Sequence, residues 1–103
     1  MALAIYKETR AFPREEIFGL TSQLRRAAVS IASNIVEGSA RSSEAEYRHF
    51  LNTAYGSARE VEYQVSLAFR LGFLPEPAYR ELSPLTVETS KVLNGLLRSL
   101  RQH

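Results

Sequence analysis

The longest amphipathic pattern in the chain runs from Leu20 to Ser39, with the sequence LTSQLRRAAVSIASNIVEGS. Wound as an α-helix, this segment places an apolar stripe on one side, at the spacing of a helix that faces a core: Leu20, Leu24, Ala27, Ala28, Ile31 and Ile35. A second apolar strip, made of Val29, Ala32 and Val36, lies on the opposite side. A helix that is apolar on two sides must bury both sides against other helices. In so short a chain, we expect the second cover to come from another copy of the protein.

Residues 2–10 predict a short helix with a small apolar face that includes Leu3, Ile5 and Tyr6. Pro13 limits its extent, because proline disfavours helical geometry in the residue before it. A helix of about nine residues is marginal in isolation. We therefore expect it to be ordered only by packing Leu3 and Ile5 on the other helices or on a neighbouring subunit.

A long helix is expected from about Glu44 to Gly72. Ser43 and Glu46 have the spacing of a capping box at its start, and glycine is a common residue at a helix end. Its apolar positions alternate steps of four and three residues, which is the heptad spacing used in antiparallel bundles: Tyr47, Leu51, Ala54, Ala58, Val61, Val65 and Ala68.

The last helix is expected to begin at Glu76 or Pro77. Pro84 lies inside its pattern, where a proline removes a backbone donor and clashes with the carbonyl of Arg80. We therefore expect either a kink at Pro84 or a fresh helix start with Ser83 as the cap. Beyond that point a broad apolar face comprises Leu85, Thr89, Val92, Leu93, Leu96, Leu97 and Leu100. Together the patterns predict an all-α, up-and-down four-helix bundle whose first helix is short.

Composition narrows the class of protein. The 103 residues suffice for one core, and we take residues 1–103 as a single domain. The absence of cysteine excludes disulfides and thiolate metal sites. No uninterrupted apolar run approaches the ~20 residues of a membrane span, and the first residues lack the pattern of a signal peptide. The expected location is the cytoplasm.

The charge of the chain is weakly basic, with a formal net charge of +2. Eleven of the 13 basic residues are arginine, whose planar guanidinium suits phosphate groups and stacks on bases. Arginine usage of this kind also arises from a GC-rich genome, with the side chains serving only as solvated surface charge. Composition by itself leaves both interpretations open.

The same segments carry a family resemblance. LTSQLRRAAVSIASNIVEG is similar to the signature of small bacterial four-helix-bundle proteins encoded in intervening sequences of large-subunit ribosomal RNA genes. The resemblance resumes in EYRHFLNTAYGSAREVEYQVSLAFRLGFL and, more loosely, in KVLNGLLRSL. The accessory variability proteins of diversity-generating retroelements resemble the same fold. Two features depart from the family: Ala32 stands where proline is frequent, and MALAIYKETRAFP is shorter than the usual first helix.

The resemblance, rather than the residue pattern, implies the partners. It implies a homopentamer, and it implies that the relatives in retroelements bind nucleic acid and a reverse transcriptase. RNA or DNA, a reverse transcriptase and further copies of the chain are therefore the partners that the resemblance suggests.

One side of the third expected helix is rich in arginine. Three arginines spaced by eleven residues, or three turns, project in nearly one line. The surface that they define, called the arginine strip below, comprises Arg48, Asn52, Tyr55, Arg59, Tyr63, Ser66 and Arg70. All of these except Ser66 are predicted to contact nucleic acid, with charges for phosphates and rings for bases. The alternative is a solvated flank, because Glu44 and Glu62 are spaced to pair with Arg48 and Arg59.

Polar residues of the central helix receive structural predictions. Arg25 lies near the second apolar strip, and Arg25, Val29, Ala32 and Val36 are predicted to form the oligomer interface, where arginine is enriched. The alternative is that Arg25 only solvates the start of the helix. Asn34 borders the core stripe and is predicted to hydrogen-bond across the bundle in a structural role.

One pattern resembles a metal site. Glu46 and His49 form a Glu-x-x-His pair, with Glu37 on the neighbouring helix, whereas di-iron bundles use two such pairs and two further glutamates. The second histidine of the chain, His103, is its last residue. The sequence also lacks a glycine-rich phosphate loop and a nucleophile elbow. We expect no metal, no cofactor and no enzymatic activity. The alternative to nucleic-acid binding is a structural or protein-interaction bundle.

Overall fold

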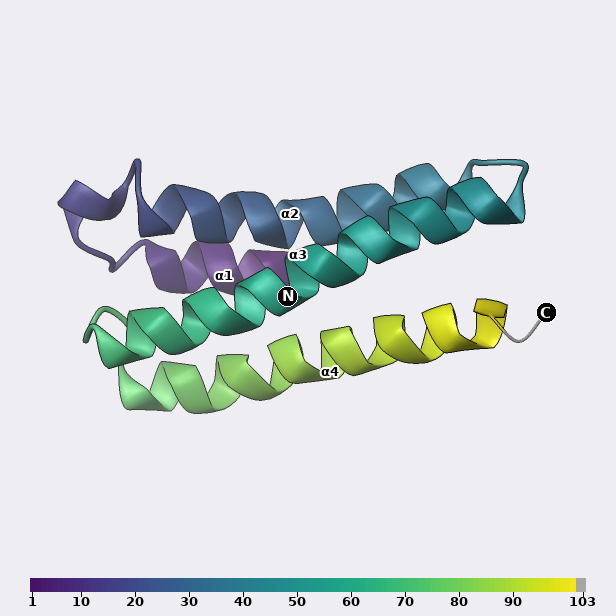
Figure 1. Cartoon of the computed structure of the whole chain (residues 1–103). Coiled ribbons are helices and arrows are strands. Elements are labelled where there is room, and N and C mark those ends of the chain that lie inside the picture. Colours follow the sequence, from purple (N-terminus) through teal and green to yellow (C-terminus); the bar gives the residue numbers. More distant parts are fainter. Residues whose placement is uncertain (102–103) are drawn as a thin grey trace.

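Residues 1–101 fold into four α-helices that run up and down beside one another (Figure 1). The computed structural model describes residues 1–101, with the elements α1 (Ala2–Thr9), the 3-10 turn η1 (Arg14–Glu16), α2 (Leu20–Ser39), α3 (Glu44–Arg70) and α4 (Glu76–Arg101). α3 packs along both α2 and α4, while α1 lies against parts of α2 and α4 near the end where these two helices begin. Residues 1–101 contain no strand, and the predicted all-α four-helix bundle with a short first helix is confirmed.

α2 has the predicted bounds and buries most of the predicted stripe. Its first free N–H group, that of Leu20, donates to Glu16 Oε1 at 3.2 Å, so a carboxylate from η1 caps the helix. Five residues of the stripe are buried: Leu20, Leu24, Ala27, Ala28 and Ile31. Ile35 was predicted in the core and is instead exposed, because it lies beyond the part of α2 that α1 covers.

Both ends of α3 have defined caps. Ser43 Oγ accepts a hydrogen bond from the Glu46 N–H at 3.1 Å, which confirms the predicted N-cap. The helix ends at Arg70, and Gly72 follows with φ +81°, a left-handed conformation that favours glycine. The Phe73 N–H then donates to the Ala68 carbonyl at 2.9 Å. All predicted core positions of α3 are buried except Tyr47, which is half-buried.

α4 is a single helix from Glu76 to Arg101 with Pro84 inside it. Of the two alternatives predicted there, a kink at Pro84 or a fresh start at Ser83, the fresh start is therefore wrong. Pro84 and Arg80 are both exposed, so water can satisfy the Arg80 carbonyl that a proline leaves without its helical donor. The Ser83 carbonyl accepts a side-chain hydrogen bond from Thr86 Oγ1 at 2.7 Å. Solvent exposure of the proline side thus lets the helix continue.

α1 is held to the bundle by buried Ile5, by three partly buried apolar residues that pack on the core (Met1, Ala2 and Ala4), and by polar contacts. Ile5 is buried as predicted, but Leu3 is exposed and does not pack on the other helices. The Met1 sulfur accepts a hydrogen bond from Thr89 Oγ1 at 3.8 Å, which places the start of the chain near the middle of α4 (Figure 1). From Thr89 toward the C-terminal end of α4, the bundle within the described residues consists of α2, α3 and α4 only.

Candidate nucleic-acid interface

The arginine strip lies along one flank of α3, as predicted from its spacing. None of its seven members is buried: Asn52, Arg59, Tyr63 and Arg70 are exposed, and Arg48, Tyr55 and Ser66 are half-buried. The strip borders α4 rather than α2, since Tyr55 and Arg59 face residues of α4. The four exposed members are therefore accessible to a ligand that follows α3.

Two of the three arginines have partners within the strip or beside it. Arg59 Nε lies 3.3 Å from Glu62 Oε2, which confirms the predicted pairing. Arg70 Nη2 donates to Ser66 Oγ at 3.0 Å. Arg48 Nε is buried and has no hydrogen-bond partner in the part of the chain that the structure describes, and the predicted pairing with Glu44 is not formed there. These surface contacts are worth about 0 to 1 kcal/mol each, so the guanidinium groups can exchange them for phosphate.

α4 adds residues that the sequence pattern of α3 did not reveal. Tyr55, Arg59 and Glu62 line a pocket of about 160 Å³ that is completed by four residues of α4: Val87, Ser90, Lys91 and Asn94. Lys91 thus places a second cation beside Arg59, and Asn94 adds amide donors. Ser90 Oγ is buried without a partner among residues 1–101. Only the antiparallel packing of α3 on α4 brings these residues to the strip, and spacing along one helix carries no signal for it.

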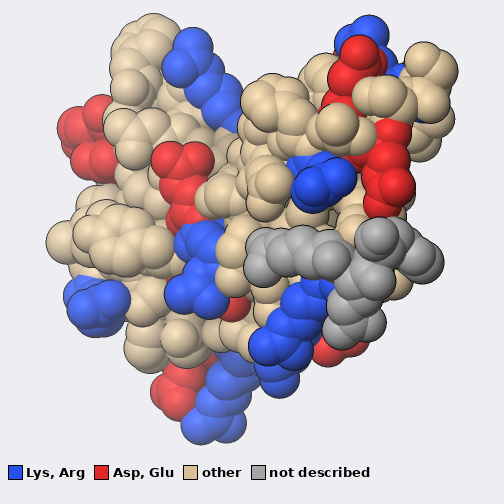
Figure 2. Space-filling view, turned by 45° about the vertical axis from the view of Figure 1, so that its right-hand side comes forward, with Lys and Arg blue, Asp and Glu red and all other residues tan. Residues whose placement is uncertain are grey.

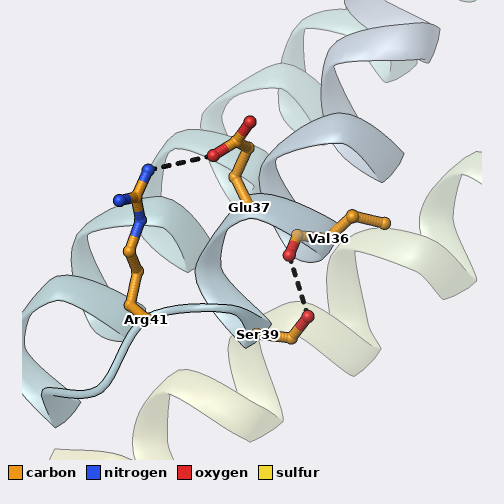
Figure 3. A network of polar contacts seen from close by, with 4 residues as sticks. All are labelled: Val36, Glu37, Ser39 and Arg41. Atoms are coloured by element: carbon orange, nitrogen blue, oxygen red, sulfur yellow. Dashed lines mark hydrogen bonds and ion pairs between the residues drawn. The ribbon is translucent and has the colours of Figure 1, made fainter.

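The surface as a whole mixes both signs of charge. Figure 2 shows lysine and arginine side chains interspersed with glutamate side chains over one face of the molecule. At the turn after α2, for example, Arg41 Nη2 lies 3.0 Å from Glu37 Oε2 (Figure 3). The same guanidinium lies 4.9 Å from the centre of the Phe50 ring. A single subunit therefore offers a polyanion local cationic sites rather than a continuous basic surface.

The predicted oligomer-interface residues are uncovered in the single chain, apart from one. Val29 and Ala32 are exposed, and Val36, with 68% of its surface accessible, points away from the Glu37–Arg41 pair (Figure 3). Arg25 is half-buried against α1: its Nε donates to Thr9 Oγ1 at 2.8 Å. Its role at an interface stays a prediction, while its role in holding α1 is a finding.

Asn34 makes a local contact instead of the predicted direct bond across the bundle. Its Nδ2 donates to the Ser30 carbonyl at 2.8 Å and to Ser30 Oγ at 3.0 Å. The cross-helix link is made by Ser30 itself, whose hydroxyl lies 2.9 Å from Ser57 Oγ on α3. Asn34 thus orients the serine that joins α2 to α3.

The residues of the Glu-x-x-His pattern lie near the turn between α2 and α3. Glu46 and His49 line an open pocket with Arg41 and Phe50. Glu37, the third residue of the pattern, is engaged by Arg41. Within the described residues no three histidine, aspartate or glutamate side chains are grouped so that they could hold a metal ion. His103 lies outside the described residues.

No helix within residues 1–101 has both the length and the apolar character needed to cross a membrane. The fold and the exposed strip define a small helical-bundle protein with its candidate binding residues on one helix flank. The chain belongs to the 23S rRNA-intervening sequence protein family, whose family model matches residues 1–95.

One solved structure is similar over most of both chains. It is the 1.70 Å crystal structure of a protein of unknown function from the S23 ribosomal protein family of Bacteroides thetaiotaomicron VPI-5482. The TM-score is 0.84 at 26% sequence identity, and the alignment covers 94% of this chain and 88% of that one. A search of curated proteins found no match.

Proposed function

We propose that the protein is a non-enzymatic homo-oligomeric bundle, acting in the cytoplasm, that binds nucleic acid through the arginine strip. Five copies is the number that the family resemblance implies. The name of the family refers to 23S ribosomal RNA, and this makes RNA the first ligand to test.

The observation that carries the proposal is the shared pocket between α3 and α4. Arg59 and Lys91 bring two cations to it from different helices, and Tyr55 brings a ring and a hydroxyl to the same place. Cations neutralise phosphates, and the exposed part of the half-buried Tyr55 ring provides a surface against which an unpaired base can stack. The acidic member, Glu62, already pairs with Arg59, so the pocket keeps a net positive charge through Lys91.

Oligomerisation would supply the positive charge that one subunit lacks for binding a polyanion. The net charge of a subunit is only +2, and its surface mixes both signs of charge. Repeating the strip around an assembly multiplies the phosphate contacts on one polyanion, and linked contacts raise avidity without any new chemistry. Binding is therefore expected to depend on assembly.

The alternative function is a structural or protein-interaction bundle that does not bind nucleic acid. The mixed charges in Figure 2 favour it, as do the partners that Arg59 and Arg70 already have on α3. On this alternative the arginines keep the protein soluble and the apolar strip of α2 binds another protein.

Fluorescence anisotropy with labelled single-stranded RNA, duplex RNA and DNA of equal length separates the two functions. Nucleic-acid binding predicts an affinity that falls with salt, with a slope of about −0.7 to −0.9 per phosphate contact. Unlabelled polyphosphate is the competitor control, since it tests charge without bases. Failure of every labelled nucleic acid to bind at low salt would contradict the proposal and favour the alternative.

A further inference from the structure

The pocket between α3 and α4 contains a polar group that the fold itself does not use. Ser90 lines the pocket and is only 4% exposed, and its Oγ has no hydrogen-bond partner within residues 1–101. Three other buried side-chain polar atoms lack a partner there, but they belong to Thr21, Arg48 and Gln64, none of which lines this pocket. A buried hydroxyl of this kind needs a partner from outside the chain, either a water molecule or a ligand.

Hydrogen-bond donors line the same pocket from both helices. Arg59 uses Nε for its contact with Glu62, at 3.3 Å, and neither of its Nη groups has a partner among the described residues. Lys91 is exposed and forms no ion pair within residues 1–101. Asn94 adds a side-chain amide and Tyr55 adds a phenol. The ligand that fits this pocket is therefore rich in acceptor atoms.

The charges of the pocket favour an anion. Arg59 and Lys91 are cations, and the one carboxylate in the lining, that of Glu62, already lies against Arg59 Nε. The other lining residues carry no charge. A phosphate group accepts charge-assisted hydrogen bonds from arginine and lysine, and its oxygens also accept from amides and hydroxyls. One phosphate can therefore satisfy the cations and the hydroxyl of Ser90 together.

The size of the pocket and its number of donors favour a phosphate at the end of a molecule. The pocket measures about 160 Å³. Pockets that enclose a drug-sized ligand measure roughly 300–1,000 Å³, so this one encloses a group rather than a whole nucleotide. An internal phosphodiester offers two non-bridging oxygens, whereas a terminal phosphate offers three and carries about −1.5 to −2 charges at pH 7. Donors that converge from several side chains on two helices match three oxygens better than two.

We infer that this pocket binds the terminal phosphate of a single-stranded nucleic acid, with Ser90 as one of the groups that hold it. Tyr55 and Arg59 belong both to the pocket and to the arginine strip, so a strand whose end lies in the pocket can continue along α3. The next arginine of the strip in either direction is eleven residues away, about 16 Å, which about five stacked nucleotides span. This inference rests on the proposed function and names the part of the nucleic acid that the pocket recognises. A free nucleotide presents the same phosphate, and the measurements below separate the two sources.

Fluorescence anisotropy with strands of ten uridines tests the inference on the full chain. The strands carry an internal fluorophore and have a 5′-phosphate, a 3′-phosphate or hydroxyls at both ends. At least one phosphate-ended strand should bind about tenfold more tightly than the hydroxyl-ended strand, because it gains charge-assisted hydrogen bonds. A hydroxyl-ended strand of twelve uridines has about the same total charge as the phosphate-ended strands and is the control. If it binds as tightly as they do, total charge explains the preference and the inference is wrong.

Ser90→Ala removes the hydroxyl and leaves every charge in place. Because Ser90 Oγ has no partner in the subunit, the urea midpoint of this variant should be at or above that of the wild type. The preference for the phosphate-ended strand should nevertheless fall by about threefold or more, with the affinity for the hydroxyl-ended strand unchanged. Ser99→Ala, at an exposed position of α4 outside the pocket, is the matched control and should keep the full preference. Full preference in Ser90→Ala would show that this hydroxyl does not hold the phosphate.

NMR with a free nucleotide reads the pocket independently of nucleic-acid binding. Adenosine 5′-monophosphate should shift the backbone amide signals of Ser90 and Lys91, and adenosine should not. Strands that bind with equal affinity whatever their end group overturn the terminal-phosphate site while the proposed function stands. Shifts with the nucleotide but no binding of any strand at low salt overturn the proposed function and assign the pocket to free nucleotides, which also overturns the nucleic-acid end as its ligand. Neither shifts nor binding overturns both.

Discussion

Arg25 on α2 donates a 2.8 Å hydrogen bond from Nε to Thr9 Oγ1 on α1, and its guanidinium lies 4.8 Å from the centre of the Tyr6 ring. Thr9 Oγ1 in turn donates to the Ile5 carbonyl at 2.8 Å. One arginine therefore joins two turns of a helix that is too short to be stable in isolation. The contacts of Arg25 with Thr9 and Tyr6 therefore hold α1 against α2, in addition to the burial of Ile5.

Arg25→Ala is expected to loosen α1 more than it destabilises the whole bundle. A hydrogen bond from a charged group contributes about 1.5 to 3 kcal/mol, and the cation–π contact about 0.5 to 1 kcal/mol at a partly exposed site. Hydrogen exchange of the α1 amides should accelerate while exchange in the centre of α3 changes little. Arg26→Ala, which removes the exposed neighbouring charge, is the control. Equal protection of α1 in Arg25→Ala and in the wild type would show that the other contacts of α1, chiefly its apolar packing, hold the helix without Arg25.

Gly38→Ala is expected to destabilise the turn end of the bundle. A Cβ at position 38 would lie 2.9 Å from the Phe50 Cβ and 3.1 Å from Tyr47 Cδ1, and both atoms belong to α3. Overpacking of this kind costs about 1 to 3 kcal/mol. Gly95→Ala is the matched control, because a Cβ there meets nothing within 4 Å and alanine favours a helix interior by about 1 kcal/mol. Urea unfolding should therefore shift in opposite directions for the two variants. A urea midpoint for Gly38→Ala at or above that of the wild type would contradict the close approach of α2 to α3 at Gly38.

Local signals in the sequence are sufficient to predict the helices and most of the buried core residues. The periodicity of residues 20–39 gave α2 its bounds, and Ser43 and Gly72 marked the ends of α3 because capping depends on neighbouring residues alone. Pro84 was misjudged as a candidate restart, since the cost of a proline depends on whether the lost hydrogen bond faces water. That exposure is set by tertiary packing.

The errors at Leu3 and Ile35 have different causes. Leu3 and Ile5 are two residues apart in α1, about 200° around the helix axis, so only one of them can face the bundle, and that residue is Ile5. For Ile35, periodicity shows that the residue belongs to an apolar face, but its burial depends on how far the other helices extend, and the first residue of α1's segment, Met1, lies near Thr89. Lys91 was missed at the candidate site for a related reason. It comes next to Arg59 only through the register of α4 on α3, which a single sequence does not encode locally.

Val36→Arg is expected to dissociate the oligomer without unfolding the subunit. Val36 is exposed in the single chain, so a charge there meets solvent in the monomer but would be buried without a partner in an apolar interface, at a cost of several kcal/mol. Light scattering at micromolar concentration should show a shift toward the 11.6 kDa subunit with helicity preserved. Ser33→Arg adds the same charge at an exposed polar position of α2 and is the control. An assembly that survives Val36→Arg would exclude this strip from the interface.

The last prediction concerns the pocket between α3 and α4. If Arg59 and Lys91 neutralise phosphates, Arg59→Ala and Lys91→Ala should each weaken binding similarly for unrelated sequences and lower the salt slope by about 1. Arg98→Ala removes an exposed charge outside the pocket and should matter less. Tyr55→Ala should weaken binding of single strands more than of duplexes, because unpaired bases can stack on the ring. Equal losses from Arg59→Ala and Arg98→Ala would mean that binding follows total charge, and that the arginine strip is a solvated flank of α3.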